Sequence, residues 1–126
     1  MSLDIVTGIP EETTGVKEVV LSFIDSINKE DFFFAGKYLD ERMQFIGVLG
    51  SRDGAVNYMS DMQEMKLKYD IKKAFVNERD VCLIYDLSID GKFIEGCGWY
   101  HVNNENKIDQ LKVLFDPRPL LENATT

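Results

Sequence analysis

The apolar residues of this chain change their spacing about halfway along the sequence. Between Val16 and about Asn28 they recur three and four residues apart, which predicts an amphipathic helix. From Lys66 onward the period is two, as in strands with one buried face. This part divides into four runs, which cover residues 66–76, 80–89, 92–102 and 107–116. The pattern therefore predicts helices first and a meander of antiparallel strands afterwards.

The segment between these two halves carries shorter elements. Asp31 is suited to cap a second helix over residues 32–41, and residues 42–50 are typical of a short strand. Ser51 or Asp53 would begin a third helix that ends at about Met65. Its apolar stripe consists of Ala55, Tyr58, Met59 and Met62. Three helices followed by a meander indicate an α+β fold with the helices packed on one face of a curved sheet.

The length of the chain fits one domain. At 126 residues it can bury a core of its own and is too short for two domains of ordinary size. We therefore expect a single domain over residues 1–126, with a folded core of about residues 14–118.

A two-residue turn at Asp90-Gly91 sets the register of the second and third strands. The expected pairs are Ile89 with Lys92, Leu87 with Ile94, Tyr85 with Gly96, Leu83 with Gly98 and Val81 with Tyr100. The next connection, residues 103–106, is read as a four-residue loop. It would pair Val102 with Lys107, Tyr100 with Asp109 and Gly98 with Leu111.

Gly96 and Gly98 point to the same face of one strand, which we expect to be the face covered by the helices. Two missing side chains there leave either a cavity floored by backbone, or a sharp bend or bulge, and this stretch favours neither. A cavity would bind a small apolar or aromatic molecule. Its expected lining is Tyr38, Gln44, Tyr58, Met62, Leu83, Tyr85, Gly96, Gly98, Leu111 and Phe115.

The pair of Asp109 and Tyr100 is the strongest candidate for a catalytic site. If both side chains face inward, partial burial would raise the pKa of the carboxyl group into the range of a catalytic base. Alternatively, Asp109 reaches water at the strand end. Asp86 opposite Glu95 is the other carboxylate pair, and we interpret it as part of a solvated charge network with Lys112.

The composition narrows the possible partners. A net charge of -8 disfavours nucleic acid and anionic membranes, and no apolar run is long enough to span a bilayer. Residues 1–15 lack the features of a secretory signal, so we expect a cytoplasmic protein. Cys82 and Cys97 form no CxxC motif, and His101, expected on the outer face, is the only histidine. We expect no metal and no cofactor.

The outer face of the sheet, which the helices do not cover, also carries apolar residues. Cys97, Trp99 and Leu114, with Cys82 and Ile84 beside them, would form an apolar patch. Such a patch predicts a homodimer, and the alternative is a partly exposed Trp99 ringed by charges.

Four segments resemble the nuclear transport factor 2-like superfamily, which includes SnoaL-like polyketide cyclases and ketosteroid isomerase. They are "VKEVVLSFIDSINKEDF", "YLDERMQFIG", "GSRDGAVNYM" and "NKIDQLKVLFDP", and the resemblance runs from about Val16 to Pro117. It implies a cystatin-like, cone-shaped α+β barrel in which a curved mixed, mainly antiparallel sheet wraps around three N-terminal helices. It also implies an apolar pocket between helices and sheet, and dimers that form through the outer face.

The resemblance does not identify the reaction, if any, that this chain would catalyse. The places of the isomerase's Tyr and two Asp residues are filled by Phe23, Ile46 and Gly98, which disfavours steroid-type isomerisation. The cyclase Asp does not align with Asp109 or Asp116, and the Arg and Asp trio of limonene epoxide hydrolase finds no match. Two functions therefore remain as alternatives. The protein is either a proton-transfer enzyme of isomerase, cyclase or dehydratase type, or a noncatalytic module for ligand binding or dimeric assembly.

Overall fold

The computed structural model describes residues 8–125 and the side chains of residues 15–121. Residues 1–7 and 126 lie outside the described residues, and with them part of the segment for which we expected no secretory signal. The α+β fold class is confirmed. The elements are α1 (Gly8–Asn28), α2 (Phe32–Gly36), β1 (Leu39–Gly47), β2 (Gly50–Asp53), α3 (Ala55–Met65), β3 (Lys68–Asn77), β4 (Asp80–Ile89), β5 (Lys92–Val102), β6 (Ile108–Phe115) and α4 (Arg118–Thr125).

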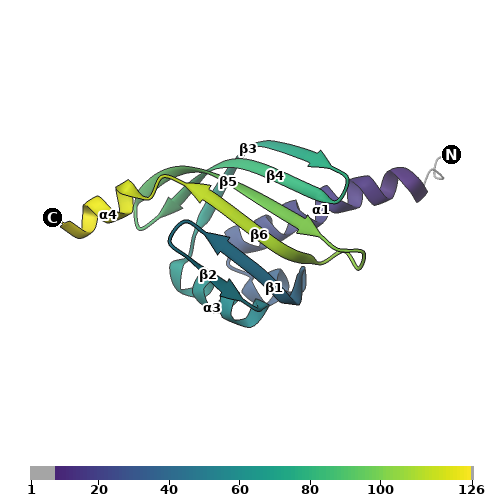
Figure 1. Cartoon of the computed structure of the whole chain (residues 1–126), viewed down its shortest axis with the longest axis horizontal. Helices are drawn as coiled ribbons and strands as arrows, with labels where there is room; N and C mark the ends of the chain where they lie inside the picture. Colours follow the sequence, from purple (N-terminus) through teal and green to yellow (C-terminus); the bar gives the residue numbers. More distant parts are fainter. Residues whose placement is uncertain (1–7, 126) are drawn as a thin grey trace.

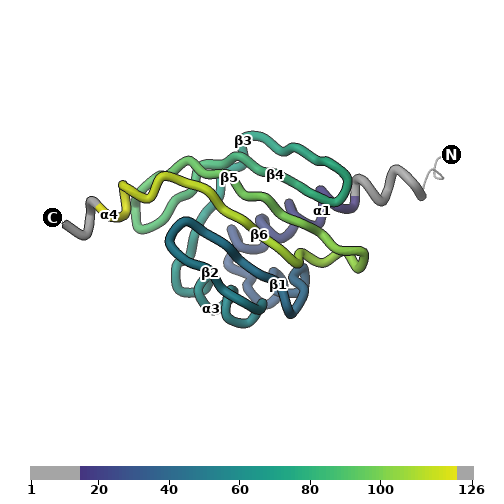
Figure 2. The backbone as a smooth tube through the Cα atoms, in the orientation of Figure 1, coloured from purple at the N-terminus to yellow at the C-terminus, as the bar shows by residue number. Residues whose placement is uncertain are grey.

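The described strands form one curved sheet that does not close. Their order is β2-β1-β6-β5-β4-β3, and β1 pairs with β6 in parallel while the other neighbours are antiparallel. The sheet curves over α1 and α3 (Figure 1), and the backbone trace shows β5 and β6 side by side between β4 and β1 (Figure 2). The concave face is therefore the one that the helices cover.

The core lies between α1 and this concave face. Val20, Phe23 and Ile27 of α1 are fully buried, and so are Val81 and Leu83 of β4. Burying an aliphatic or aromatic side chain of this size contributes about 1.5–3 kcal/mol to stability. The helical spacing from Val16 onward is thus confirmed as the packing face, although α1 begins earlier, at Gly8.

The short elements before residue 66 differ from the prediction. Asp31 caps α2 as expected, since its carboxylate accepts a hydrogen bond from the Phe34 backbone N–H at 3.2 Å. However, α2 ends at Gly36 and the chain is already a strand at Leu39. Residues 50–53 form β2 and not the start of a helix, and α4 follows the last strand where no element was predicted.

The turn at Asp90-Gly91 gives the predicted register. All five expected pairs between β4 and β5 are present, from Ile89 with Lys92 to Val81 with Tyr100. Asp90 and Gly91 have φ angles of 52° and 74°, as a type I′ turn requires. This part of the sequence-based prediction is confirmed.

The predicted register of β5 with β6 is wrong. Tyr100 pairs with Leu111 and not Asp109, and Gly98 pairs with Val113. There are two causes: the loop is one residue longer than predicted, since Val102 pairs with Ile108 and not Lys107, and a bulge follows it, since His101 pairs with Gln110. Asp109 is the extra residue. Opposite Val102, Ile108 points into the core, where it is fully buried, whereas the predicted pairs of its neighbours Lys107 and Asp109 would have turned it outward.

Candidate functional site

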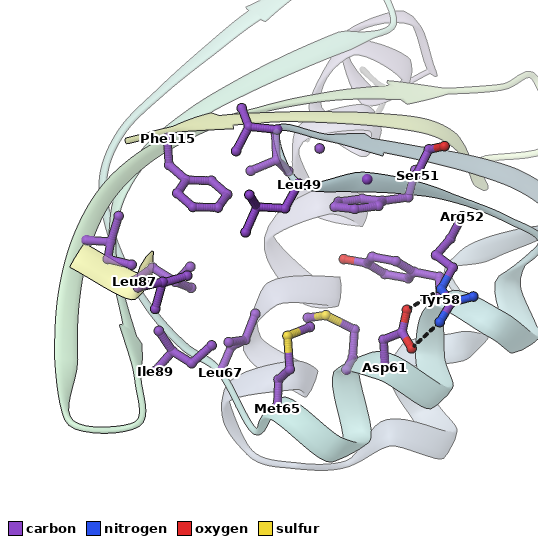
Figure 3. Close-up of a pocket in the computed structure, with 18 of the residues that line it drawn as sticks. Leu49, Ser51, Arg52, Tyr58, Asp61, Met65, Leu67, Leu87, Ile89 and Phe115 are labelled. Carbon is purple, nitrogen blue, oxygen red and sulfur yellow. Dashed lines mark hydrogen bonds and ion pairs between the residues drawn. The ribbon is translucent and has the colours of Figure 1, made fainter. Parts of the chain in front are cut away.

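A cavity of about 420 Å³ opens between the β1–β2 hairpin, α3 and the concave face of strands β3 to β6. Its volume is at the small end of the range for ligand pockets, about 300–1,000 Å³. The wall is mainly aliphatic and aromatic, with Leu49, Met65, Leu87 and Phe115 around its centre (Figure 3).

Four parts of the chain build the wall. On α3, Tyr58, Asp61, Met62 and Met65 recur at helical spacing and so share one face of the helix. The β1–β2 turn adds Val48 and Leu49, and the strands add alternate residues of their inner face. Leu120 of α4 also lines the cavity.

Phenols make up half of the polar side chains that line the cavity, beside Ser51, Arg52 and Asp61. Tyr58 directs its hydroxyl toward the centre of the cavity (Figure 3), and Tyr69 and Tyr85 also line the wall. The rings of Tyr69 and Tyr85 meet edge to face, with centroids 4.9 Å apart. Burial raises the pKa of all three phenols above their ordinary value of 10.0, so they remain neutral hydrogen-bond donors at physiological pH.

One ion pair lies on the wall beside Tyr58. Arg52 donates two hydrogen bonds to Asp61, with Nε at 2.7 Å from Oδ2 and an Nη at 3.1 Å from Oδ1. Among the described residues, no other carboxylate and no other cation lines the cavity. Both oxygens of Asp61 accept from Arg52, so the proton of a substrate would have to compete with the guanidinium group for this carboxylate.

The cavity is not where the glycines had suggested. A Cβ at Gly98 would lie 2.8 Å from Cε1 of Tyr100, and a Cβ at Gly96 would lie 3.0 Å from Cε1 of Tyr85. The two tyrosine rings therefore occupy the space that the missing side chains leave. The predicted hole over the glycines is wrong, and the pairing of β5 there runs without the bulge that was the other possibility.

The expected ligand-binding residues divide into two groups. Tyr58, Met62, Tyr85 and Phe115 line the cavity; Tyr38, Gln44, Leu83, Gly96, Gly98 and Leu111 do not. Leu83 and Leu111 are core residues with at most 1% of their surface exposed, and Gln44 is exposed on β1. Tyr38 packs its ring against Phe34 at a centroid distance of 5.4 Å.

Asp109 and Tyr100 do not form the expected pair. Asp109 lies on the outer face, where its carboxylate is 2.7 Å from Nδ1 of His101. Tyr100 stays inside and is fully buried, and its hydroxyl group has no hydrogen-bond partner among the described residues. The prediction of an inward-facing acid beside a phenol at this strand end is therefore wrong.

Several cavity residues escaped the sequence-based prediction. Arg52 and Leu49 belong to the β1–β2 hairpin, which was not recognised as two strands. Asp61 and Met65 could have been found, because they share the helical stripe of Tyr58 and Met62. No three His, Cys, Asp or Glu side chains gather as a metal site in the described part of the chain.

The outer face carries exposed apolar side chains. Trp99 and Leu114 are 47% and 65% exposed, and Phe93 on the same strand as Trp99 is 76% exposed. The sulfur atoms of Cys82 and Cys97 lie 3.3 Å apart, and burial raises the pKa of Cys82 to about 11.

The charge network around Asp86 differs from the expectation, since Asp86 pairs with Lys72 at 3.1 Å. Lys112 lies over the Trp99 ring at 5.2 Å.

The fold and the cavity together define an NTF2-like protein. An NTF2-like protein of unknown function from Cytophaga hutchinsonii is 45% identical to this chain, with a TM-score of 0.82, and the match covers 84% of this chain and 94% of that one. The chain belongs to the NTF2-like family. No family model and no curated protein sequence matches it.

Two more distant neighbours share the fold. An LEH-like epoxide hydrolase from M. tuberculosis is 18% identical, has a TM-score of 0.73, and is matched over 88% of this chain and 90% of its own. The epoxide hydrolase/cyclase-like enzyme SalBIII, with a role in pyran ring formation in the polyether salinomycin, is 14% identical with a TM-score of 0.74, over 84% of this chain and 94% of its own. At these identities the likeness concerns the fold. No helix in residues 8–125 combines the length and apolar character of a membrane span.

Proposed function

We propose that this protein binds a small, largely apolar molecule in the cavity between α3, the β1–β2 hairpin and the sheet. The observation that carries the proposal is a hollow of about 420 Å³ with an apolar wall and a few buried phenols. Ligand sites in proteins share this composition, because apolar surface supplies affinity and a few polar groups fix orientation.

Binding is a better-supported function than proton transfer. A proton-transfer enzyme requires a base within hydrogen-bond reach of its substrate. Asp61 is the carboxylate nearest to the cavity, and Arg52 holds both of its oxygens. The epoxide hydrolase and SalBIII show that this fold can act on small organic molecules, but those enzymes share only the fold with this chain.

The neutral dye N-phenyl-1-naphthylamine tests the proposal, because its fluorescence rises in apolar surroundings. We expect saturable binding, and at least tenfold weaker binding by the Met65→Trp variant, whose larger side chain enters the cavity. Val56→Trp is the matched control, since Val56 lies on the same helix, is 82% exposed and does not line the cavity. Absence of saturable binding, or equal affinity of the two variants, would count against the proposal.

The outer face supports a second proposal, a homodimer formed through Cys97, Trp99 and Leu114. Its support is the exposure of Trp99, Leu114 and Phe93 on one face of the sheet. Sedimentation velocity at micromolar concentration is expected to show a dimer that Trp99→Lys converts to a monomer. Glu105→Lys, an exposed loop substitution, is the control for added positive charge. A wild-type monomer would remove this proposal and leave the ligand-binding proposal intact.

A further inference from the structure

Phenols from different elements contribute to the wall of the cavity. Tyr58 of α3, Tyr69 of β3 and Tyr85 of β4 line the wall, and Tyr100 of β5 lies in the core nearby. The four residues are named here the tyrosine cluster. A phenol adds a polar hydroxyl group to an apolar ring, so the three members that line the cavity can form hydrogen bonds with a bound molecule.

The members of the tyrosine cluster are close to one another. The Tyr69 and Tyr85 rings are in edge-to-face contact at 4.9 Å, and the Tyr85 ring in turn covers Gly96 at the centre of the sheet. Burial, and then the charges that Tyr69, Tyr85 and Tyr58 would carry, raise the pKa of Tyr100. All four hydroxyl groups therefore remain protonated and can donate hydrogen bonds.

The cavity offers donors but no free positive charge. Arg52 is the one cation on the wall within the described residues, and Asp61 neutralises it. An anionic group would have to leave water for a site without a partner charge, which is costly. A neutral oxygen atom with lone pairs loses far less, because it can accept a hydrogen bond from a phenol.

We infer that the cavity takes an uncharged ligand with a hydrogen-bond acceptor oxygen, such as a ketone or an ether, which accepts a hydrogen bond from Tyr58. This inference rests on the proposed ligand-binding function and specifies its ligand class. The hydroxyl of Tyr58 is the donor because it points into the centre of the cavity (Figure 3). The apolar remainder of the ligand then lies against Leu49, Leu87 and Phe115.

Fluorenone and fluorene form a matched pair of probes, since they differ in one carbonyl oxygen. The ratio of their affinities, measured by calorimetry, reports the hydrogen bond. A net hydrogen bond is worth about 0.5–1.5 kcal/mol, so we expect Tyr58→Phe to lower the fluorenone-to-fluorene ratio about two- to tenfold. Tyr38→Phe makes the same chemical change outside the cavity and is expected to leave the ratio unchanged.

A spectroscopic measurement on the wild-type protein supports the same test. A hydrogen bond from Tyr58 would shift the infrared carbonyl stretch of bound fluorenone to lower wavenumber than in an apolar solvent. Fluorenone-4-carboxylate, which adds a negative charge, is expected to bind at least tenfold more weakly than fluorenone.

The possible outcomes separate this inference from the proposed function. If neither fluorenone nor fluorene binds, the ligand-binding proposal itself fails. If both bind, and neither the ratio changes in Tyr58→Phe nor the carbonyl stretch shifts, the inferred acceptor is wrong while ligand binding stands. Tighter binding of the carboxylate would overturn the preference for an uncharged ligand.

Discussion

The concave face of the sheet is solid in one region and hollow in another. Over Gly96 and Gly98 the rings of Tyr85 and Tyr100 fill the space so closely that a single added carbon would lie 3.0 or 2.8 Å from them. At the other end, between α3 and the β1–β2 hairpin, about 420 Å³ is free. Both regions lie under the same curved sheet and contain the same kinds of side chain.

The difference shows that an absent side chain does not make a cavity. Proteins pack to the density of organic crystals, so a neighbouring ring occupies a gap on a strand when it can reach. Tyr85 reaches Gly96 from the paired strand, and Tyr100 reaches Gly98 from two residues along the same strand. A cavity forms instead where whole elements are held apart, as the hairpin and α3 are here.

Adding a methyl group to the solid region is expected to have the largest effect on stability. Gly98→Ala places Cβ 2.8 Å from Cε1 of Tyr100, a buried ring that cannot move freely. Overpacking of this kind costs typically 1–3 kcal/mol, which urea unfolding would measure as a lower free energy of unfolding. Gly96→Ala meets Tyr85 at 3.0 Å and is expected to cost less.

Gly15→Ala is the control for this substitution. Gly15 lies in α1, and a Cβ there would meet nothing within 4 Å. Alanine is favoured over glycine inside helices by about 1 kcal/mol, so this variant is expected to gain stability. If Gly98→Ala were as stable as the wild type, the region over Gly98 would not be solid and the contrast between the two regions would disappear.

The two β-hairpins show how much of the fold could be predicted. The Asp90-Gly91 turn allows one register, and every expected pair between β4 and β5 is present. The loop after Val102 is longer, and its Asn103 side chain accepts hydrogen bonds from the backbone N–H groups of Glu105 and Lys107. A bulge follows this loop, and periodicity gives no sign of it. The longer loop and the bulge together leave Asp109 on the face opposite to the predicted one.

The candidate site was predictable only where regular periodicity reaches it. Tyr58 and Met62 belong to the helical stripe of α3, and Tyr85 to the alternation of β4, so they could be found. β2 has four residues, all exposed, and therefore carries no hydrophobic pattern by which Arg52 could have been placed. Leu120 belongs to α4, beyond the expected folded core of about residues 14–118. The cavity depends on long-range packing of these short elements, which a local pattern does not encode.

Removing one oxygen atom from the solid region is expected to have the smallest effect. The Tyr100 hydroxyl group is fully buried and has no hydrogen-bond partner among the described residues. A buried polar group without a partner costs about 1–3 kcal/mol, and the loss of its contacts offsets part of the gain from removing it. Tyr100→Phe is therefore expected to leave the free energy of unfolding unchanged or to raise it by up to about 1 kcal/mol. Because Tyr100 does not line the cavity, the affinity for N-phenyl-1-naphthylamine is expected to stay the same. A loss of more than about 1 kcal/mol would mean that a buried water satisfies the hydroxyl, and weaker dye binding would mean that the solid and hollow regions are coupled.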